Sequence, residues 1–504
     1  MQRNKKSILN AISAMALSLC NGLFGLVVVK MIITYFGSDF NGLNSTASQI
    51  VTILMLLEGG FTVATNVALF KPYATKDYDK VNAIISATRS TFQKIGIISM
   101  GVGIAISLGY SFVINSNLPR VLVFSIFLMT ILPVCFNFYY ATKYRILLQA
   151  EQKEYIISLI TLITTVLGYI VNIFAMQLGC SMWTIRFTTM IFAIINSLTI
   201  GLYVKQKYRF LNLKQPPDFK AVQGTKDVFA QKLTGVFYST APIVSITLTA
   251  GGTMLASVYA VYNSIFVLLK GILHAVIDAP RLGLGELIAA DDKKNVWRVF
   301  QQYQLIINWL LFAFIATAAA LIMPFINIYT KGINDINYRQ PLIALLLVLI
   351  CYFELIHIPS GHLLNMSGSF KISRNFQIIA CFIMCSGILL TLSFRLGIYG
   401  ILSSVLLTAI CLCVLEIGFI HTKYFEGKIR AFLRMSLPTI LVAIPLIFIE
   451  INYLPSISGY INFGIIGIAV FLINVIIGFL ITLISNYQIT LAVMKRFFMI
   501  LKRK

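Results

Sequence analysis

Charge is scarce in this sequence, and acidic charge is the scarcest kind. Only 11% of the 504 residues are charged, and 17 are Asp or Glu. Because a soluble domain carries about a quarter charged residues, a soluble globular protein is excluded. The sequence instead has continuous apolar runs of about 20 residues or more, the length that a helix needs to cross a bilayer. They do not alternate like the strands of a membrane barrel, so the prediction is an all-α polytopic membrane protein.

Several chemical motifs are also missing. There is no GxxxxGK[ST] loop, so ATP binding of the Walker type is excluded. The 8 cysteines form no CxxC pair, and nothing resembles a His–Cys metal cluster or a serine triad. The external segments between apolar runs are short and leave no room for a catalytic domain. We therefore expect a protein that is not an enzyme and that needs no cofactor.

The basic residues are distributed unevenly. The net charge is +23, and most of the 40 Lys and Arg fall in segments that are cytoplasmic if residue 1 is. The exceptions are Arg120, Lys331, Arg339 and Arg395 in external turns and Lys30, Arg186 and Lys270 inside apolar runs. This is the positive-inside bias, and it predicts that both termini are cytoplasmic. Membrane lipids, and not nucleic acid, are the expected partners of the basic tail "MKRFFMILKRK".

About fourteen membrane-spanning helices are predicted. They are 7–35, 42–70, 92–114, 120–140, 155–178, 182–204, 230–250, 253–276, 303–329, 341–364, 376–393, 398–420, 435–453 and 460–485. The first run resembles a signal peptide at its start. It continues to residue 35, however, which favours a retained first span.

An internal repeat organises these spans. "LLEGG" (56–60) matches "LLKGI" around Lys270, "LLQAEQKEY" (147–155) matches "LLNMSGSFK" (363–371), and "MQLG" (176–179) matches "FRLG" (394–397), at offsets of roughly 212 to 218 residues. The offset corresponds to six spans, an even number, so both halves enter the membrane in the same direction. We predict two parallel six-helix lobes around a central cleft, followed by two additional helices.

The repeat also predicts the domains. Residues 1–215 form an N-lobe, 216–425 form a C-lobe, and 426–504 hold the last two spans and the basic cytoplasmic tail.

The eighth span carries a polar stripe. At 100° per residue, one face of this helix and its extension holds Tyr259, Asn263, Lys270, His274 and Arg281. An ionisable residue near a helix centre costs about 2.5–3.5 kcal/mol on insertion scales, so this face should avoid lipid. We expect it to line a hydrophilic passage. The alternative is that Lys270 pairs with a carboxylate of the other lobe and only holds the lobes together.

Two other spans carry carboxylates. Glu58 shares a face with Thr62 and Thr65, and Glu354 lies one turn before His357. These groups are candidates for binding a coupling H⁺ or Na⁺. The alternatives are an ion pair of Glu58 with Lys270 or another cation, and a buried structural role for His357.

The remaining charged residues of the apolar runs are expected at the membrane–water interface. Lys30 and Arg186 lie near the external ends of their spans, where long side chains reach the interface. Glu416 lies at a span terminus, where solvation is the default expectation.

With these features, the sequence resembles the Wzx-type polysaccharide flippases of the multidrug/oligosaccharidyl-lipid/polysaccharide (MOP) exporter superfamily. The segments that carry the resemblance are "KSILNAIS", "YFGSDFNGLNS", "LLEGGFTVATNVAL", "LLQAEQKEY", "LNMSGSFKISRN" and "LGIYGILSS". The plan of two six-helix lobes plus two helices also fits, so the resemblance covers almost the whole chain.

The resemblance implies a function. A flippase of this kind moves an undecaprenyl-pyrophosphate-linked oligosaccharide from the cytoplasmic to the external leaflet of the bacterial plasma membrane by alternating access. Lys270 and Arg281 would attract the pyrophosphate, Tyr259, Asn263 and His274 would contact the head group, and Glu58, Glu354 and His357 are candidates for ion coupling. Its further partners would be the polysaccharide polymerase and export machinery.

Other functions remain open. A drug or cation antiporter of the same superfamily would favour an acidic or aromatic cavity. A lipid II flippase shares both the fold and the need for cations. A membrane-embedded glycosyl ligase or polymerase would need a large external loop, which the sequence lacks, and the loop 71–91 lacks the signature of the major facilitators.

Overall fold

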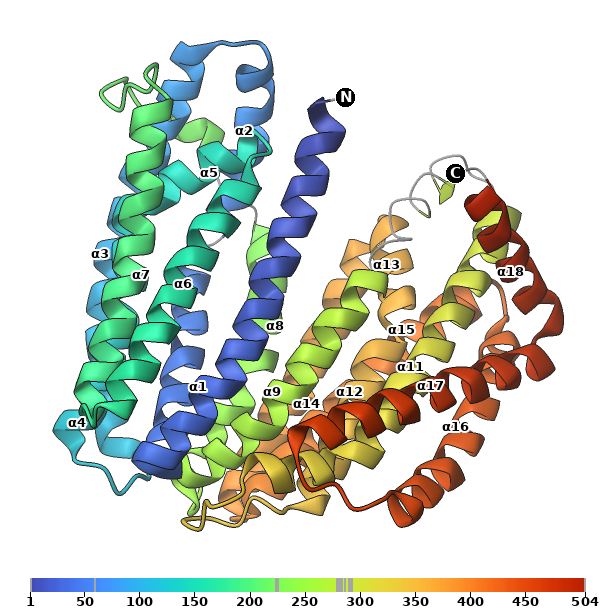
Figure 1. The fold of residues 1–504 in the computed structure, drawn as a ribbon. Helices are drawn as coiled ribbons and strands as arrows, with labels where there is room; N and C mark the ends of the chain where they lie inside the picture. Colours follow the sequence, from blue (N-terminus) through green and yellow to red (C-terminus); the bar gives the residue numbers. More distant parts are fainter. Residues whose placement is uncertain are drawn as a thin grey trace. The chain divides into compact units, whose positions relative to one another are not determined.

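The computed structural model describes residues 2–58, 60–222, 226–277, 284, 287–288 and 293–502. These residues form helices and turns, without a β-strand among them (Figure 1). Twelve helices are long and apolar enough to cross a membrane. The predicted fold class is confirmed: the chain is an all-helical, multi-pass membrane protein.

The twelve helices and one further apolar helix account for the fourteen predicted spans. Helix α1 (Gln2–Leu54) contains the first predicted span and the beginning of the second, because the helix is kinked where Gly37 adopts φ 84°. A left-handed φ is accessible to glycine at little cost, which is why the chain can turn at this residue. The seventh span is α8 (Lys226–Ile246).

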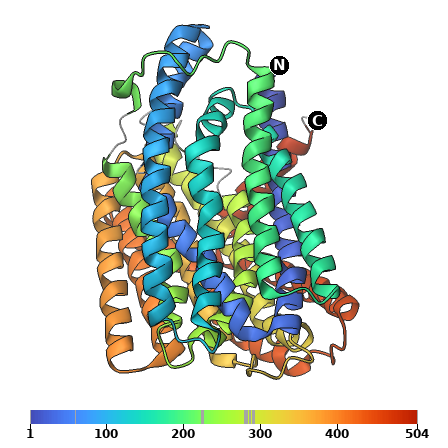
Figure 2. The ribbon, with the colours of Figure 1, turned by 90° about the vertical axis from the view of Figure 1, so that its left-hand side faces the viewer.

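The chain divides into two compact units, and the first extends to Val261. In order, unit 1 holds α1, the 3-10 helix η1 (Met55–Glu58), α2 (Phe61–Ala74), α3 (Tyr78–Val113), α4 (Arg120–Phe136), a π-turn (Asn137–Ala141), α5 (Thr142–Ala150), α6 (Glu154–Gln177), α7 (Met182–Lys207), α8 and the start of α9 (Gly252–Ile277). Figure 2 shows the long helices α3 and α7 beside the broken path of α4 and α5.

Unit 2 begins at Tyr262, within α9. Its elements are the rest of α9, α11 (Lys293–Tyr329), α12 (Pro341–Ile356), α13 (Ile358–Met366), α14 (Phe370–Ser393), α15 (Gly397–Phe419), a second π-turn (Ile420–Tyr424), α16 (Ile429–Tyr453), α17 (Tyr460–Ser485) and α18 (Tyr487–Lys502). Helix α11 is central in this unit, because α12, α16 and α17 all pack against it.

The repeat is visible in the backbone. Helices α6 and α14 are both 24 residues long, and both of their ends are related by an offset of 216 residues. After α6, the Cys180 amide donates to the Ala175 carbonyl, and after α14 the Leu396 amide donates to the Thr391 carbonyl at the same offset. The pairing of "MQLG" with "FRLG" is therefore wrong by two residues: Gly179 corresponds to Arg395, and both have positive φ.

The turn before each of these helices is also repeated. Gln152 has φ 60° and Gly368, at the equivalent position, has φ 75°. A side chain costs about 1–2 kcal/mol in this left-handed conformation. The first half of the repeat therefore tolerates backbone strain that the second half avoids with glycine.

This difference gives a paired prediction. Gly368→Ala should lower the free energy of unfolding by about 1 kcal/mol, because the new methyl group meets open space and only the backbone is strained. Gln152→Gly should leave it unchanged or raise it slightly. The thermal unfolding midpoint of the purified protein measures both. Gly101→Ala, in the interior of α3 and also facing open space, is the control and should not destabilise.

Candidate functional site

One residue of the predicted polar stripe, Lys270, forms an ion pair within unit 2. The Lys270 ammonium group on α9 donates to Glu354 Oε2 on α12 at 2.9 Å. Both side chains are partly exposed, at 27% and 17%. Lys270 therefore pairs with a carboxylate of its own half of the chain, whereas the alternative to a passage-lining role was a carboxylate of the other half.

A second acid–base pair lies farther along the same span. His357, at the junction of α12 and α13, has its Nδ1 2.7 Å from Glu416 Oε2 on α15. The expectation that Glu416 is solvated is wrong, since this residue is only 4% exposed. Gly361 lies against it: a Cβ at that position would be 2.7 Å from Glu416 Oε2. Glycine thus makes the space in which the buried carboxylate fits.

These two pairs form a series across unit 2. Glu354 and His357 are one helical turn apart, yet the first contacts α9 and the second contacts α15. The tenth span therefore carries ionisable groups that connect to helices on both sides of it. Such an arrangement can hold or release protons or exchange one counter-ion for another.

The other residues of the eighth-span stripe have different surroundings. Tyr259 is buried and belongs to unit 1, whereas Asn263 and His274 are half-buried in unit 2. Arg281 lies outside the described residues. The structure brings Lys270 together with Glu354, and it places His357 with Glu416.

Glu58 is at the end of η1 in unit 1. Its Oε2 accepts a hydrogen bond from the Thr62 hydroxyl at 2.8 Å, while the Thr65 hydroxyl donates to the Phe61 carbonyl. The predicted face of Glu58 and Thr62 therefore exists, although the helix is interrupted between them. Lys270, the repeat counterpart of Glu58, lies in an uninterrupted helix.

Two arginines inside unit 1 have positions that differ from the predicted ones. Arg186 does not extend to the interface: it is 8% exposed, and its Nε and Nη2 donate to the Thr130 hydroxyl at 3.0 and 2.7 Å. Arg145 was counted among the cytoplasmic charges because the fourth span was expected to end at residue 140. Helical structure instead continues through the π-turn to Ala150, and Arg145 packs inside the unit, where its Nη2 donates to Asn196 Oδ1.

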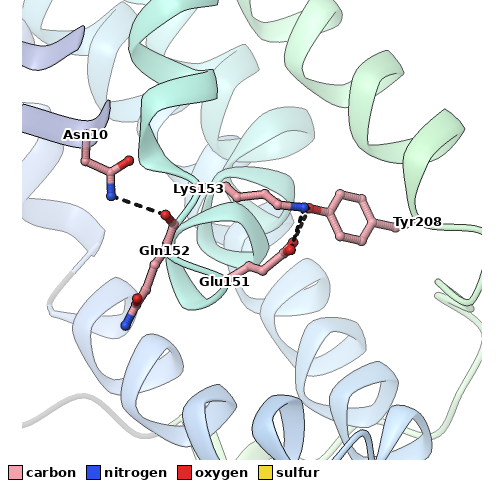
Figure 3. Close-up of polar contacts among 5 residues, drawn as sticks. All are labelled: Asn10, Glu151, Gln152, Lys153 and Tyr208. Carbon is pink, nitrogen blue, oxygen red and sulfur yellow. Dashed lines mark hydrogen bonds and ion pairs between the residues drawn. The ribbon is translucent and has the colours of Figure 1, made fainter. Parts of the chain in front are cut away.

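The turn between α5 and α6 ties three helices of unit 1 together (Figure 3). The Asn10 side chain of α1 donates to the Gln152 carbonyl and accepts from the Tyr155 amide, at 3.2 and 2.7 Å. Glu151 pairs with Lys153 and accepts the hydroxyl hydrogen of Tyr208, which follows α7. The segment "LLQAEQKEY" thus acts as a structural joint.

The protonation of Tyr208 fits this joint. Burial, together with the neighbouring Glu151 carboxylate, raises the pKa of Tyr208 far above its usual range. The hydroxyl therefore keeps its proton and remains a donor to Glu151 at any physiological pH. Burial and the same carboxylate also raise the pKa of Tyr73 on α2.

The described ranges contain no group of three or more His, Cys, Asp or Glu that could hold a metal ion. The ionisable pairs described above are the candidate site.

Solved structures with the same fold are transporters or flippases. No family model and no curated protein matches the chain. A structure of the lipid II flippase MurJ in an inward closed conformation is 15% identical, covers 93% of this chain and 98% of its own, and has a TM-score of 0.69. An inward-facing multidrug resistance MATE family transporter of the MOP superfamily is 14% identical, covers 85% and 98%, and has a TM-score of 0.57. A eukaryotic MATE transporter is 15% identical, covers 87% and 99%, and has a TM-score of 0.56. The chain therefore has the fold of the MOP superfamily.

Proposed function

We propose that this protein is a flippase that moves a pyrophosphate-linked oligosaccharide lipid from the cytoplasmic to the external leaflet by alternating access. The fold supports a flippase or transporter. A lipid II flippase structure accounts for 93% of the chain, and the two MATE structures account for 85% and 87%. Sugar hydroxyls and phosphates are too costly to move through hydrocarbon without polar partners, so such a substrate needs a protein path.

The observation that carries the proposal is the sign of the charges inside unit 1. Arg145 and Arg186 both lie within spans, and neither pairs with a carboxylate in the described part of the chain. Uncompensated buried cations favour an anionic substrate. A carrier of cationic drugs would be expected to offer carboxylates at these positions.

Within this proposal Lys270 exchanges partners. Its ammonium group is held by Glu354, and a pyrophosphate would compete for it. Arg281 would assist, Tyr259, Asn263 and His274 would contact the head group, and Glu58, Glu354 and His357 would bind any coupling H⁺ or Na⁺. The proposed location is the bacterial plasma membrane.

Lys270→Ala tests the proposal. In proteoliposomes, the variant should flip a lipid-linked oligosaccharide about tenfold or more slowly than the wild type, because a charge-assisted contact contributes about 1.5–3 kcal/mol. Lys270→Arg should retain most of the rate, and Lys331→Ala, an exposed cation of the same unit, is the control.

The same assay separates the rival functions. Lipid II offered in place of the oligosaccharide lipid would be flipped faster if the protein were a lipid II flippase. A cationic dye would be exported, without any flipping of either lipid, if it were a drug antiporter. Wild-type protein that flips no pyrophosphate-linked lipid would overturn the proposal.

A further inference from the structure

Unit 1 contains a cavity that is lined by Arg145 and to which no part of the substrate has been assigned. It has a volume of about 370 Å³, within the range of about 300–1,000 Å³ typical of small-molecule sites. The lining comes from α4, the π-turn, α5, α6, α7 and η1. It includes the side chains of Asn137, Arg145, Thr161, Tyr169, Phe192 and Asn196. The cavity therefore lies among spans and has both polar and aromatic walls.

Arg145 gives this cavity an uncompensated positive charge. Its Nη2 donates to Asn196, but its Nε is buried and has no hydrogen-bond partner. Asn196 in turn donates to Thr161 and Thr164 at 3.1 and 3.0 Å. Because the oxygen and the nitrogen of its side-chain amide are both hydrogen-bonded, Asn196 holds the guanidinium in place. Guanidinium remains protonated at every accessible pH. The cavity is thus prepared for a negatively charged group.

The lining contains a second buried atom without a hydrogen-bond partner, and this atom is an acceptor. Asn137 Oδ1, at the start of the π-turn, is buried and accepts no hydrogen bond. A buried acceptor of this kind requires a donor such as a hydroxyl group. A halide or a sulfate ion would satisfy Arg145 but has no proton to donate to Asn137. A neutral sugar would satisfy Asn137 and leave the guanidinium unpaired.

We infer that this cavity binds an acidic, hydroxyl-bearing group of monosaccharide size, such as a uronic acid. The carboxylate accepts from Arg145, a ring hydroxyl donates to Asn137, and the Tyr169 and Phe192 rings offer apolar walls for the C–H faces of the sugar. The inference rests on the proposed function, because it identifies one sugar of the transported head group as acidic.

Binding of soluble probes to the purified full-length protein tests this inference. Equilibrium dialysis with radiolabelled glucuronate should show saturable binding, and glucose or sulfate at matched ionic strength should bind about tenfold more weakly or worse. Arg145→Gln should weaken glucuronate binding by a similar factor, and Asn137→Leu should weaken it as well. Arg120→Gln, which removes an exposed guanidinium of the same unit that does not line the cavity, should bind like the wild type.

Several outcomes would overturn it. They are equal binding of sulfate and glucuronate, which means an inorganic-anion site only, equal binding of glucose, no binding of glucuronate, or binding that survives Arg145→Gln. The thermal unfolding midpoint of each variant without ligand shows that it is folded.

Flipping assays separate this failure from a failure of the proposed function. A wild-type protein that binds no glucuronate, and flips neutral and uronate-containing lipid-linked oligosaccharides equally well, refutes the inference alone. A protein that flips neither lipid refutes the function.

Discussion

Replacing Gly42 with alanine is expected to lower the free energy of unfolding by about 3 kcal/mol, near the upper end of what overpacking costs. A Cβ at this position would be 1.7 Å from the carbonyl oxygen of Thr253, at the start of α9. The atoms that this Cβ would meet belong to the backbone of Thr253 and Ser257, so no side chain can rotate out of the way. The clash has to be relieved by moving one helix away from the other.

Such a movement would break several polar contacts at the same place. Asp39 accepts hydrogen bonds from the Ser116 hydroxyl, the Asn117 amide and the Thr253 hydroxyl, and the Asn41 side chain donates to the Ser257 hydroxyl at 2.7 Å. The unfolding midpoint in detergent, followed together with the monodisperse fraction, measures the loss. Gly25→Ala is the matched control on the same helix, because its Cβ would meet open space. Equal midpoints for the two variants would contradict the close approach of α1 and α9.

Replacing His357 with leucine should be similarly damaging. The change leaves the Glu416 carboxylate, whose side chain is 6% exposed, without its imidazole partner at 2.7 Å. Removing one partner of a buried hydrogen bond costs about 1–3 kcal/mol, and more where the group left behind is a carboxylate, because that group stays buried without a partner. We expect the free energy of unfolding to fall by about that amount in equilibrium unfolding with mixed micelles.

A double-mutant cycle separates this pair from ordinary packing. Glu416→Leu added to His357→Leu should recover most of the lost stability, since two apolar side chains of similar size then occupy the site. If the two substitutions are additive, the groups do not interact and the pair is not a unit. Glu354→Gln is a useful comparison, because its partly exposed pair with Lys270 should contribute about 1 kcal/mol or less.

The spans and the repeat were predictable because both depend on long patterns. A long apolar run by itself predicts a membrane-spanning helix. The match of "LLQAEQKEY" to "LLNMSGSFK" corresponds to turns with identical hydrogen bonds at one offset. The error at "FRLG" arose because Leu-Gly is common in apolar sequences. The conserved feature is the backbone conformation, so Gly179 corresponds to Arg395 and not to Gly397.

The candidate site was predictable only in part. The positions of Lys270, Glu354 and His357 follow from their place in apolar runs, but their partners depend on which helices are neighbours. Glu416 was predicted to be solvated because it lies near the end of its span. Its burial depends instead on the space beside Gly361, which belongs to another helix. Arg145 was missed because its segment, "ATKYRILLQA", reads as the end of a span, and only the apolar "ILL" hinted that the helix continues.

The π-turn at Asn137–Ala141 determines where Arg145 lies. In this turn the Thr142 amide bonds back to the Asn137 carbonyl, so the helix contains one residue more than regular α-geometry would place there. Each residue rotates a helix by about 100°, and α5 is therefore turned by that angle relative to α4. Removing a single codon from this stretch would swing Arg145 out of the cavity without altering any side chain of α5. Insertion or deletion of one residue at this position is thus a route by which a chain of this fold can gain or lose a cation in its interior.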